Sequence, residues 1–150
     1  MPGYGMPTGT KGLLPWSWAE ERLRESHNYY VMTVRPDTTP HTMPVWGIWV
    51  DGRFYFSTGA QSRKARNLAG NPSCVVCTDN AAEAVIVEGT ASTLDDAARI
   101  SGLSPEYARK YKPFTLDPKM GPIFEVAPKV VFGLYEQEFK SMTRWLFASR

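Results

Sequence analysis

The chain has 150 residues, of which 43% are hydrophobic and 21% are charged. Seventeen basic and fifteen acidic residues leave a formal net charge of +2, a balance too mild to indicate nucleic-acid binding by itself. No apolar run reaches the roughly 18 residues that a membrane-spanning helix needs. We therefore expect a globular protein with neither a nucleic-acid nor a membrane partner.

The first residues differ in composition from the rest. Met1 to Gly12 is rich in glycine and proline and lacks the hydrophobic stretch of a signal peptide. We expect residues 1–14 to form a flexible tail, residues 15–150 to form one domain, and the protein to be cytoplasmic.

The first half of the chain predicts one helix and three strands. Pro15 suits the first turn of a helix. The run Pro36–Pro40 is a turn signal, and Asp51-Gly52 is a strong hairpin signal. We expect a helix over 15–25 and a meander of strands over 29–35, 41–50 and 53–58.

The second half adds short helices and more strands. Ser62 is a plausible helix N-cap, and Gly70 suits the end of that helix. We expect helices over 63–69, 95–101 and 105–111, and strands over 73–79, 83–94, 130–136 and 139–147. About seven strands without a strand–helix–strand rhythm disfavour a parallel sheet, and an antiparallel barrel is favoured because closure removes exposed edges.

The two cysteines form a CxxC pair. Cys74 and Cys77 lie in a β-branched run, where an offset of three residues puts the two sulfurs on opposite faces of a strand. A zinc site would need two more ligands, and His27 and His41 lack the required spacing. We expect buried, reduced thiols and no metal site.

The most informative segment runs from a strand through a turn of small residues into a basic helix start. Ser57, Thr58 and Ser62 offer hydroxyls, and a helix N-terminus favours an anion. Arg63 and Lys64 oppose the helix dipole at that position, which indicates a negative group nearby. The segment predicts a phosphate site, and a solvated surface helix is the alternative.

Three motifs in order support a family resemblance. Ser62-Arg63-Lys64-Ala65, Asn71-Pro72 and Val85-Ile86-Val87-Glu88-Gly89-Thr90-Ala91 together resemble the pyridoxamine 5′-phosphate oxidase-like split β-barrel superfamily. The similarity is best over 18–94 and loose in the C-terminal hairpin. It implies a mainly β (α+β) fold, namely a six-stranded antiparallel split β-barrel with short flanking helices. It also implies a homodimer with the cofactor groove at the subunit interface.

The resemblance also assigns residues. An Arg-Lys pair matching Arg63 and Lys64 binds the cofactor phosphate with a hydroxyl matching Thr58, and the strand over 42–46 runs beneath the isoalloxazine ring. Trp145 is a candidate for the cleft, with core packing as the alternative. The candidate cofactor-binding residues are Thr42, Met43, Pro44, Val45, Trp46, Ser57, Thr58, Ser62, Arg63, Lys64, Asn67, Arg144 and Trp145.

Within the superfamily, the chain departs from the founding enzymes. It lacks their basic C-terminal motif, and Ala84 stands where they have glutamine. The neutral strand over 43–46 looks closer to the oxidoreductases of type B that use the deazaflavin coenzyme F420. The longer anionic tail of a deazaflavin needs extra cations, and the candidates are Arg66, Lys140 and Arg144.

We therefore expect an oxidoreductase that passes hydride from reduced coenzyme F420 to a small organic acceptor. FMN is the alternative cofactor, and a cofactor carrier without turnover is the alternative function. No side chain is nominated as catalytic, because solvent or cofactor can supply the proton. His41 is a candidate acid–base group on residue type, although a surface histidine is the more ordinary interpretation.

Overall fold

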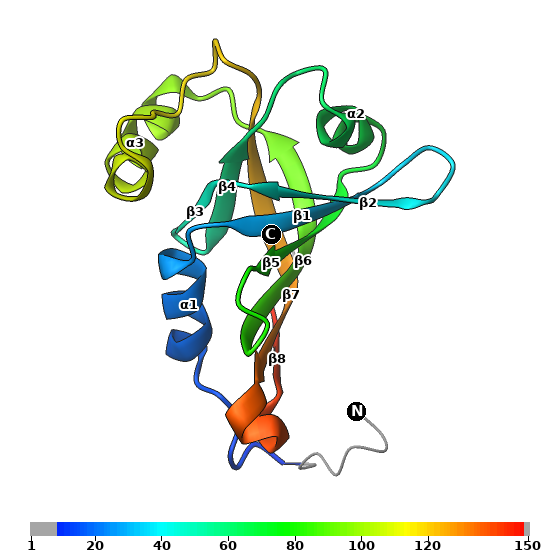
Figure 1. The fold of residues 1–150 in the computed structure, drawn as a ribbon, viewed down its shortest axis with the longest axis vertical. Helices are drawn as coiled ribbons and strands as arrows, with labels where there is room; N and C mark the ends of the chain where they lie inside the picture. The colour runs from blue at the N-terminus through cyan, green and yellow to red at the C-terminus, as the bar shows by residue number, and fades with distance from the viewer. Residues whose placement is uncertain (1–8, 149–150) are drawn as a thin grey trace.

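One antiparallel sheet organises the chain, and three helices flank it (Figure 1). The computed structural model describes residues 9–148. The helices are α1 (Trp16–Glu25), α2 (Arg63–Gly70), α3 (Ala97–Tyr111) and the 3₁₀ helix η1 (Glu136–Ser141). The strands are β1 (Tyr29–Val34), β2 (Pro40–Val45), β3 (Gly47–Val50), β4 (Arg53–Ser57), β5 (Ser73–Thr78), β6 (Glu83–Thr93), β7 (Ile123–Tyr135) and β8 (Thr143–Leu146).

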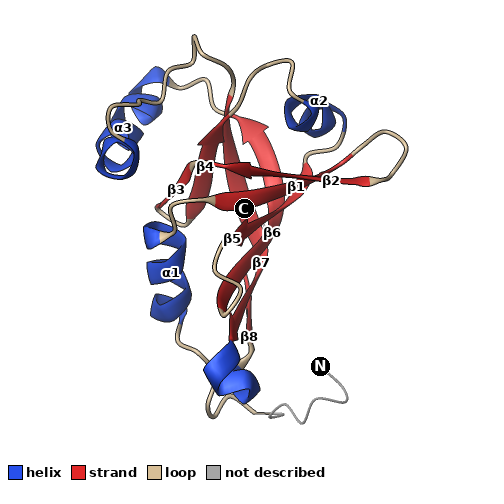
Figure 2. Cartoon of the chain, viewed as in Figure 1, coloured by secondary structure: helices blue, strands red, loops and turns tan. Residues whose placement is uncertain are grey.

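The strand order is β2-β1-β5-β6-β7-β4-β3, and β8 pairs with β7 beside this path. The sheet curls into a half-barrel with the helices outside it, as the secondary-structure colours show (Figure 2). The predicted mainly β split barrel with short flanking helices is confirmed. Its strand count is eight in the described chain, whereas the resemblance implied six.

The predicted strand over 41–50 is wrong in one respect, because the chain leaves the sheet at Trp46. β2 pairs with β1 and β3 pairs with β4, so the two halves of that segment lie at opposite ends of the strand order and no three-stranded meander forms. The break follows from Gly47, where a Cβ would lie 2.2 Å from the ring of Phe54. Side chains of α3 also bond the Gly47 backbone, where a neighbouring strand would otherwise do so.

The C-terminal half is more continuous than predicted. The helices expected over 95–101 and 105–111 form the single helix α3, with Pro105 inside it. Apolar residues on one side of α3 pack in a second core, which holds the helix together across the hydrogen bond that proline removes. β7 begins at Ile123, seven residues before the predicted start, and the predicted strand over 139–147 shortens to β8 because η1 occupies its first part.

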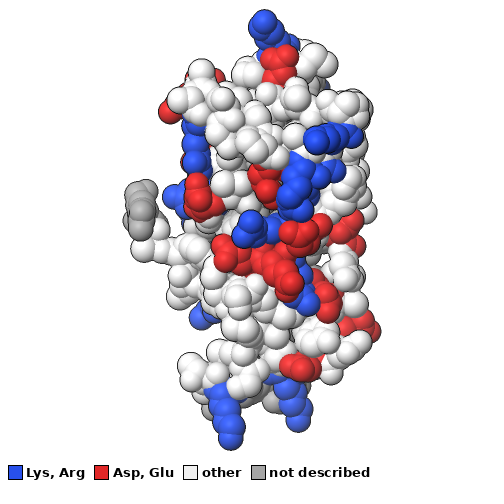
Figure 3. Space-filling view, turned by 90° about the vertical axis from the view of Figure 1, so that its left-hand side faces the viewer, with Lys and Arg blue, Asp and Glu red and all other residues white. Residues whose placement is uncertain are grey.

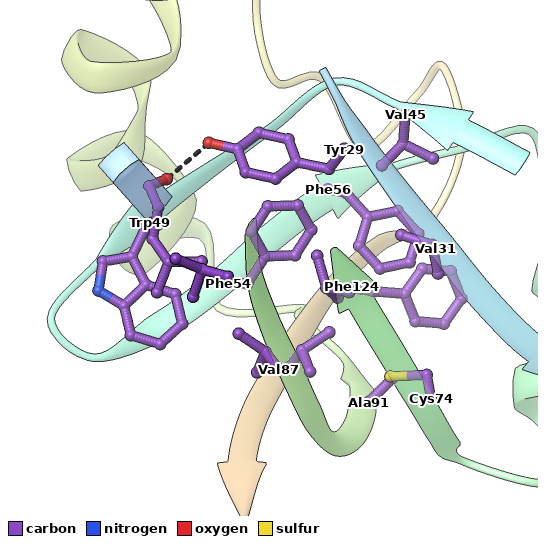
Figure 4. Close-up of a cluster of buried hydrophobic side chains, with 14 of the residues drawn as sticks. Tyr29, Val31, Val45, Trp49, Phe54, Phe56, Cys74, Val87, Ala91 and Phe124 are labelled. Carbon is purple, nitrogen blue, oxygen red and sulfur yellow. Dashed lines mark hydrogen bonds between the residues drawn. The ribbon is translucent and has the colours of Figure 1, made fainter. Parts of the chain in front are cut away.

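The main core fills the half-barrel with stacked aromatic rings (Figure 4). The ring of Phe56 lies 6.0 Å from that of Phe54 and 5.3 Å from that of Phe124. Tyr29 donates a buried hydrogen bond of 2.6 Å to the Leu23 carbonyl, which ties β1 to the end of α1 (Figure 4). This packing fixes the strands from which the candidate site is built.

A second core lies on the other face of β3 and β4, under α3. Its buried members include Ile48, Tyr55, Leu103 and Tyr107. Phe54 and Tyr55 point to opposite faces of β4, yet both are fully buried. Alternation along this strand therefore separates two cores, and it does not separate a core from solvent.

The predicted tail and cysteines have distinct outcomes. Residues 1–8 of the tail lie outside the described residues, and Leu14 at its other end is buried and donates its N–H to Thr143 Oγ1 at 2.8 Å. Cys74 is buried and Cys77 half-buried on opposite faces of β5, as predicted, and both are free thiols. Burial raises the pKa of Cys74 to about 12.

Residues 9–148 contain no group of three or more side chains that could hold a metal ion. No helix in that range is long and apolar enough to cross a membrane.

Candidate functional site

The predicted N-cap of α2 is present. Ser62 Oγ accepts the Ala65 N–H at 3.2 Å, and the Thr58 hydroxyl donates to Ser62 Oγ at 3.1 Å. The end of β4 is thereby tied to the start of α2. Because the first turn of a helix has no internal acceptors, the N–H groups of Arg63 and Lys64 stay available to a ligand.

The two cations at this helix start lack anionic partners. Within residues 9–148, neither Arg63 nor Lys64 forms an ion pair or a side-chain hydrogen bond, and the first turn of α2 holds no acidic residue. Lys64 is half-buried, and desolvation lowers its pKa. A partly buried ammonium at the positive end of a helix is an unfavourable arrangement that a bound anion would relieve. The residues present fit a phosphate group.

His41 at the start of β2 belongs to the same cluster. Partial burial lowers its pKa, and the positive charges of Arg35, Lys64 and Arg63 lower it further. Because these charges act on His41 through space, the end of β1, the start of β2 and the start of α2 lie near one another. His41 Nδ1 is buried and has no hydrogen-bond partner among the described residues. Sequence reasoning did not join Arg35 and His41 to the phosphate segment, because only the β1–β2 pairing brings them there.

β2 supplies an open backbone edge. In the described chain it pairs with β1 alone, so its other edge is not covered by a neighbouring strand. Of the residues expected beneath the cofactor ring, Thr42, Met43 and Pro44 are exposed and Val45 lies in the main core.

Trp46 lies outside the strand, at the other end of β2 from His41. Its indole stacks on Tyr111 with ring centroids 5.0 Å apart and planes 12° apart. It also contacts Phe114 at 5.1 Å. Five residue steps of about 3.3 Å separate His41 from Trp46, so cations and aromatic rings mark two ends of a segment roughly 17 Å long.

Asn67 faces the sheet, away from the cations. It is almost fully buried, and its amide donates to Thr33 Oγ1 at 2.9 Å, which holds α2 against β1. Ser57 is half-buried and pairs with Ile123 in the sheet, one residue before Thr58. Asn67 therefore holds the helix in place from behind, while Ser57 stands at the entrance to the turn.

β8, which carries the C-terminal candidates, lies beside β7 and below α2 in the view of Figure 1. Trp145 packs edge-on against Trp16 at 5.4 Å and covers Gly133, where a Cβ would lie 2.8 Å from the indole. Arg144 beside it is exposed. Within one protomer the structure therefore does not bring Arg144 and Trp145 to the cation cluster.

Some of the charges on other elements form ion pairs, and four arginines of the described residues take part in them. Figure 3 shows basic and acidic groups interspersed on the face that carries α1 and α3. A cleft of about 780 Å³ beside the β3–β4 turn contains two arginines that both face acids. Arg99 meets Asp51 at 3.1 Å and Arg53 lies 3.9 Å from Glu125. Among the cations of α2, Lys64 differs from these arginines in being half-buried without an ion pair in the described residues.

The motifs and the half-barrel agree with a comparison against known families. The family profile described as pyridoxamine 5′-phosphate oxidase matches residues 18–135. The chain belongs to this family. The match runs from α1 to the end of β7, and so includes the candidate site on β2, β4 and α2.

Solved structures share the fold of this pyridoxamine 5′-phosphate oxidase family member. General stress protein 26 from Bacillus anthracis aligns with a TM-score of 0.69 and 18% identity, over 87% of this chain and 97% of that chain. A structure named F420 reductase has a TM-score of 0.59 and 24% identity, over 75% and 94%. A pyridoxamine 5′-phosphate oxidase-related, FMN-binding protein from Nostoc punctiforme has a TM-score of 0.61 and 20% identity, over 92% of each chain. No curated protein sequence matches the chain.

Proposed function

We propose that the protein binds a phosphate-bearing flavin-type cofactor and uses it in two-electron redox chemistry with a small organic acceptor. The proposed cofactor is the deazaflavin coenzyme F420, with FMN as the alternative. The observation that carries the proposal is the half-buried Lys64, which stands beside Arg63 at the start of α2 without an anionic partner. Membership of an oxidase family supports the redox role.

The residues divide into two groups by what they would bind. Arg63 and Lys64 would hold the phosphate through charge-assisted hydrogen bonds, together with the free N–H groups of the first turn of α2. The hydroxyls of Thr58 and Ser62 keep that turn in shape. The open edge of β2 would meet the polar rim of the ring with backbone groups. When bound, the cofactor supplies the hydride transfer, and the protein binds and orients it.

The choice of coenzyme F420 rests on the sequence resemblance and on a fold neighbour of that description. FMN keeps its place as the alternative because another fold neighbour is described as FMN binding. The two cofactors share the phosphate chemistry of α2, so the cation cluster serves both.

A homodimer is part of the same proposal. A largely apolar groove of about 460 Å³ crosses the faces of β1, β5 and β6, which suits contact with a second copy. Arg144 is exposed, so it is available to a partner's cofactor. Sedimentation with and without cofactor tests whether the protein forms a dimer and whether cofactor binding strengthens it.

The deciding experiment titrates purified apo protein with coenzyme F420 and, separately, with FMN, and follows cofactor fluorescence. Tight binding of F420 alone supports the deazaflavin, and tight binding of FMN alone supports the flavin. Binding of neither would contradict the proposal. The reduced complex is then mixed with acceptors, because a carrier without turnover binds the cofactor yet shows no acceptor-dependent oxidation.

A further inference from the structure

Large hydrophobic side chains are exposed at the Trp46 end of β2. Trp46 is 37% exposed and Phe114, which it contacts, is 56% exposed. Met120 is 80% exposed and belongs to the same connection, the 112–122 loop between α3 and β7. Met43 on β2 is 45% exposed. A pair of exposed aromatic rings in contact, such as Trp46 and Phe114, is a feature of binding surfaces.

The peptide that follows Trp46 is held from several directions. The Gly47 N–H donates to Tyr111 Oη at 3.0 Å, and the Gly47 carbonyl accepts from Lys110 Nζ at 3.0 Å. Tyr111 also stacks on the indole of Trp46. Trp46 is therefore fixed before any ligand arrives, which lowers the entropy cost of binding.

The 112–122 loop is anchored at its middle and at its far end. Leu116 is buried in the second core. Gly121 lies so close to β4 that a Cβ would come within 2.2 Å of the Thr58 carbonyl oxygen, and the Thr58 N–H donates to the Pro122 carbonyl at 3.3 Å. The loop thus reaches from Trp46 to the turn that precedes α2.

We propose that Trp46 and Phe114 form a stacking platform for a flat, uncharged ring compound. This rests on the proposed function, in which that compound is the electron acceptor. The rings of the two residues meet at 56°, so one ring lies across the edge of the other and the pair presents two apolar surfaces. The cation cluster lies at the other end of β2, so the two ends differ in the charge they favour: an anion at α2 and a neutral ring at Trp46.

The platform is tested on apo protein by calorimetric titration with 2-naphthol, a flat neutral probe, and with 2-naphthalenesulfonate, its charged counterpart. We expect 2-naphthol to bind more tightly than the sulfonate. Phe114→Ala and Trp46→Leu should each raise the Kd for 2-naphthol by about fivefold, the scale of one lost aromatic contact. Leu146→Ala, which removes a side chain 70% exposed on β8, is the control and should leave the Kd unchanged.

Phe114 lies on an exposed part of the loop, so Phe114→Ala keeps the test valid if Trp46→Leu fails to fold. Equal Kd values for Phe114→Ala and wild type would overturn the proposal, and so would tighter binding of the sulfonate. Sedimentation of both proteins gives a further check. If Phe114→Ala weakens self-association while naphthol binding is unchanged, the surface is a subunit contact and no platform.

The outcome is separable from that of the proposed function. Naphthol binding without cofactor binding keeps the platform and removes the flavin-type cofactor. Cofactor binding with no effect of Phe114→Ala on the Kd for naphthol keeps the cofactor and removes the platform.

Discussion

Lys110 donates a hydrogen bond of 2.7 Å to the phenol oxygen of Tyr29, and no carboxylate of residues 9–148 is bonded to either group. The ammonium also lies 4.7 Å from the centre of the Tyr29 ring. Burial lowers the pKa of Lys110 to about 8 and raises that of Tyr29. A partly buried cation is therefore held by direct contacts with oxygen dipoles and aromatic faces, while the carboxylates of Glu106, Glu25 and Asp79 favour its charge from a distance.

This arrangement predicts a pH dependence of stability. The folded protein releases the Lys110 proton near pH 8, whereas the unfolded chain retains it to about 10.5, so the unfolded state binds more protons between these values. The contribution of Lys110 to the free energy of unfolding should therefore rise with pH over that window. Urea unfolding of wild type and Lys110→Met at several pH values checks this. Subtracting the variant's free energy of unfolding from that of wild type cancels the contributions of tyrosine and cysteine, which both proteins share. We expect this wild-type-minus-variant value to rise with pH, and a value that falls would contradict the assignment.

Loss of either cation at the start of α2 should weaken cofactor binding. Arg63→Gln and Lys64→Gln each remove charge-assisted hydrogen bonds to phosphate, so we expect the Kd of the cofactor to rise roughly tenfold or more. Arg24→Gln is the matched control, since Arg24 is an exposed helical arginine on α1. Fluorescence titration at fixed salt measures all three. Similar small effects in the three variants would argue against the phosphate site.

His41 should make cofactor binding depend on pH. Neighbouring cations lower its pKa in the free protein, and a bound anion would counter them and raise it. Binding should then take up a proton, so affinity should increase as the pH falls from 7 towards 5.5. The ratio of wild-type to His41→Asn affinity isolates this effect from the titration of the phosphate itself. A ratio that is constant with pH would show that the anion does not bind near His41.

Ser62→Ala should destabilise the start of α2. The change removes the acceptor of the Ala65 N–H and the partner of the Thr58 hydroxyl, and loss of an N-cap costs about 1 kcal/mol. Denaturant unfolding measures the change in the free energy of unfolding. Ser101→Ala, at an exposed position in α3, is the control and should have an effect near zero.

Gly121→Ala and Gly102→Ala should have opposite effects. At Gly121 the backbone φ is +151° and a Cβ would collide with the Thr58 carbonyl, so alanine should cost about 2 kcal/mol or more. At Gly102 in α3 a Cβ meets nothing within 4 Å, so alanine should add about 0.5–1 kcal/mol. Thermal or urea unfolding of both variants gives the comparison. Stabilisation by Gly121→Ala would show that the loop does not press against Thr58.

Local sequence signals predicted the parts of the fold that depend on neighbours in the chain. The N-cap Ser62, the turn at Asp51-Gly52 and the opposite faces of Cys74 and Cys77 all follow from short-range rules. The break at Trp46 was missed because it depends on Gly47 meeting Phe54 and on bonds from two residues of α3 that lie 63 and 64 residues further along the chain.

The candidate site was predicted in part for the same reason. Arg63, Lys64 and Thr58 are close in sequence, and the strand-to-helix turn brings them together. Arg35 and His41 join them only through strand pairing. The contact between Trp46 and Phe114 had no sequence signal, since it arises where the end of α3 meets the end of β2.

The two cores have a consequence for how this protein can change. The main core fixes β1, β2 and α2, whereas α3 and the 112–122 loop rest on the separate layer around Leu103 and Tyr107. Substitutions in that second layer can reshape the loop beside Trp46 while the cations of α2 keep their positions. The two layers meet at Thr58, where Gly121 of the loop is held, so the surface around Phe114 can vary while the loop keeps its anchor at the turn before α2.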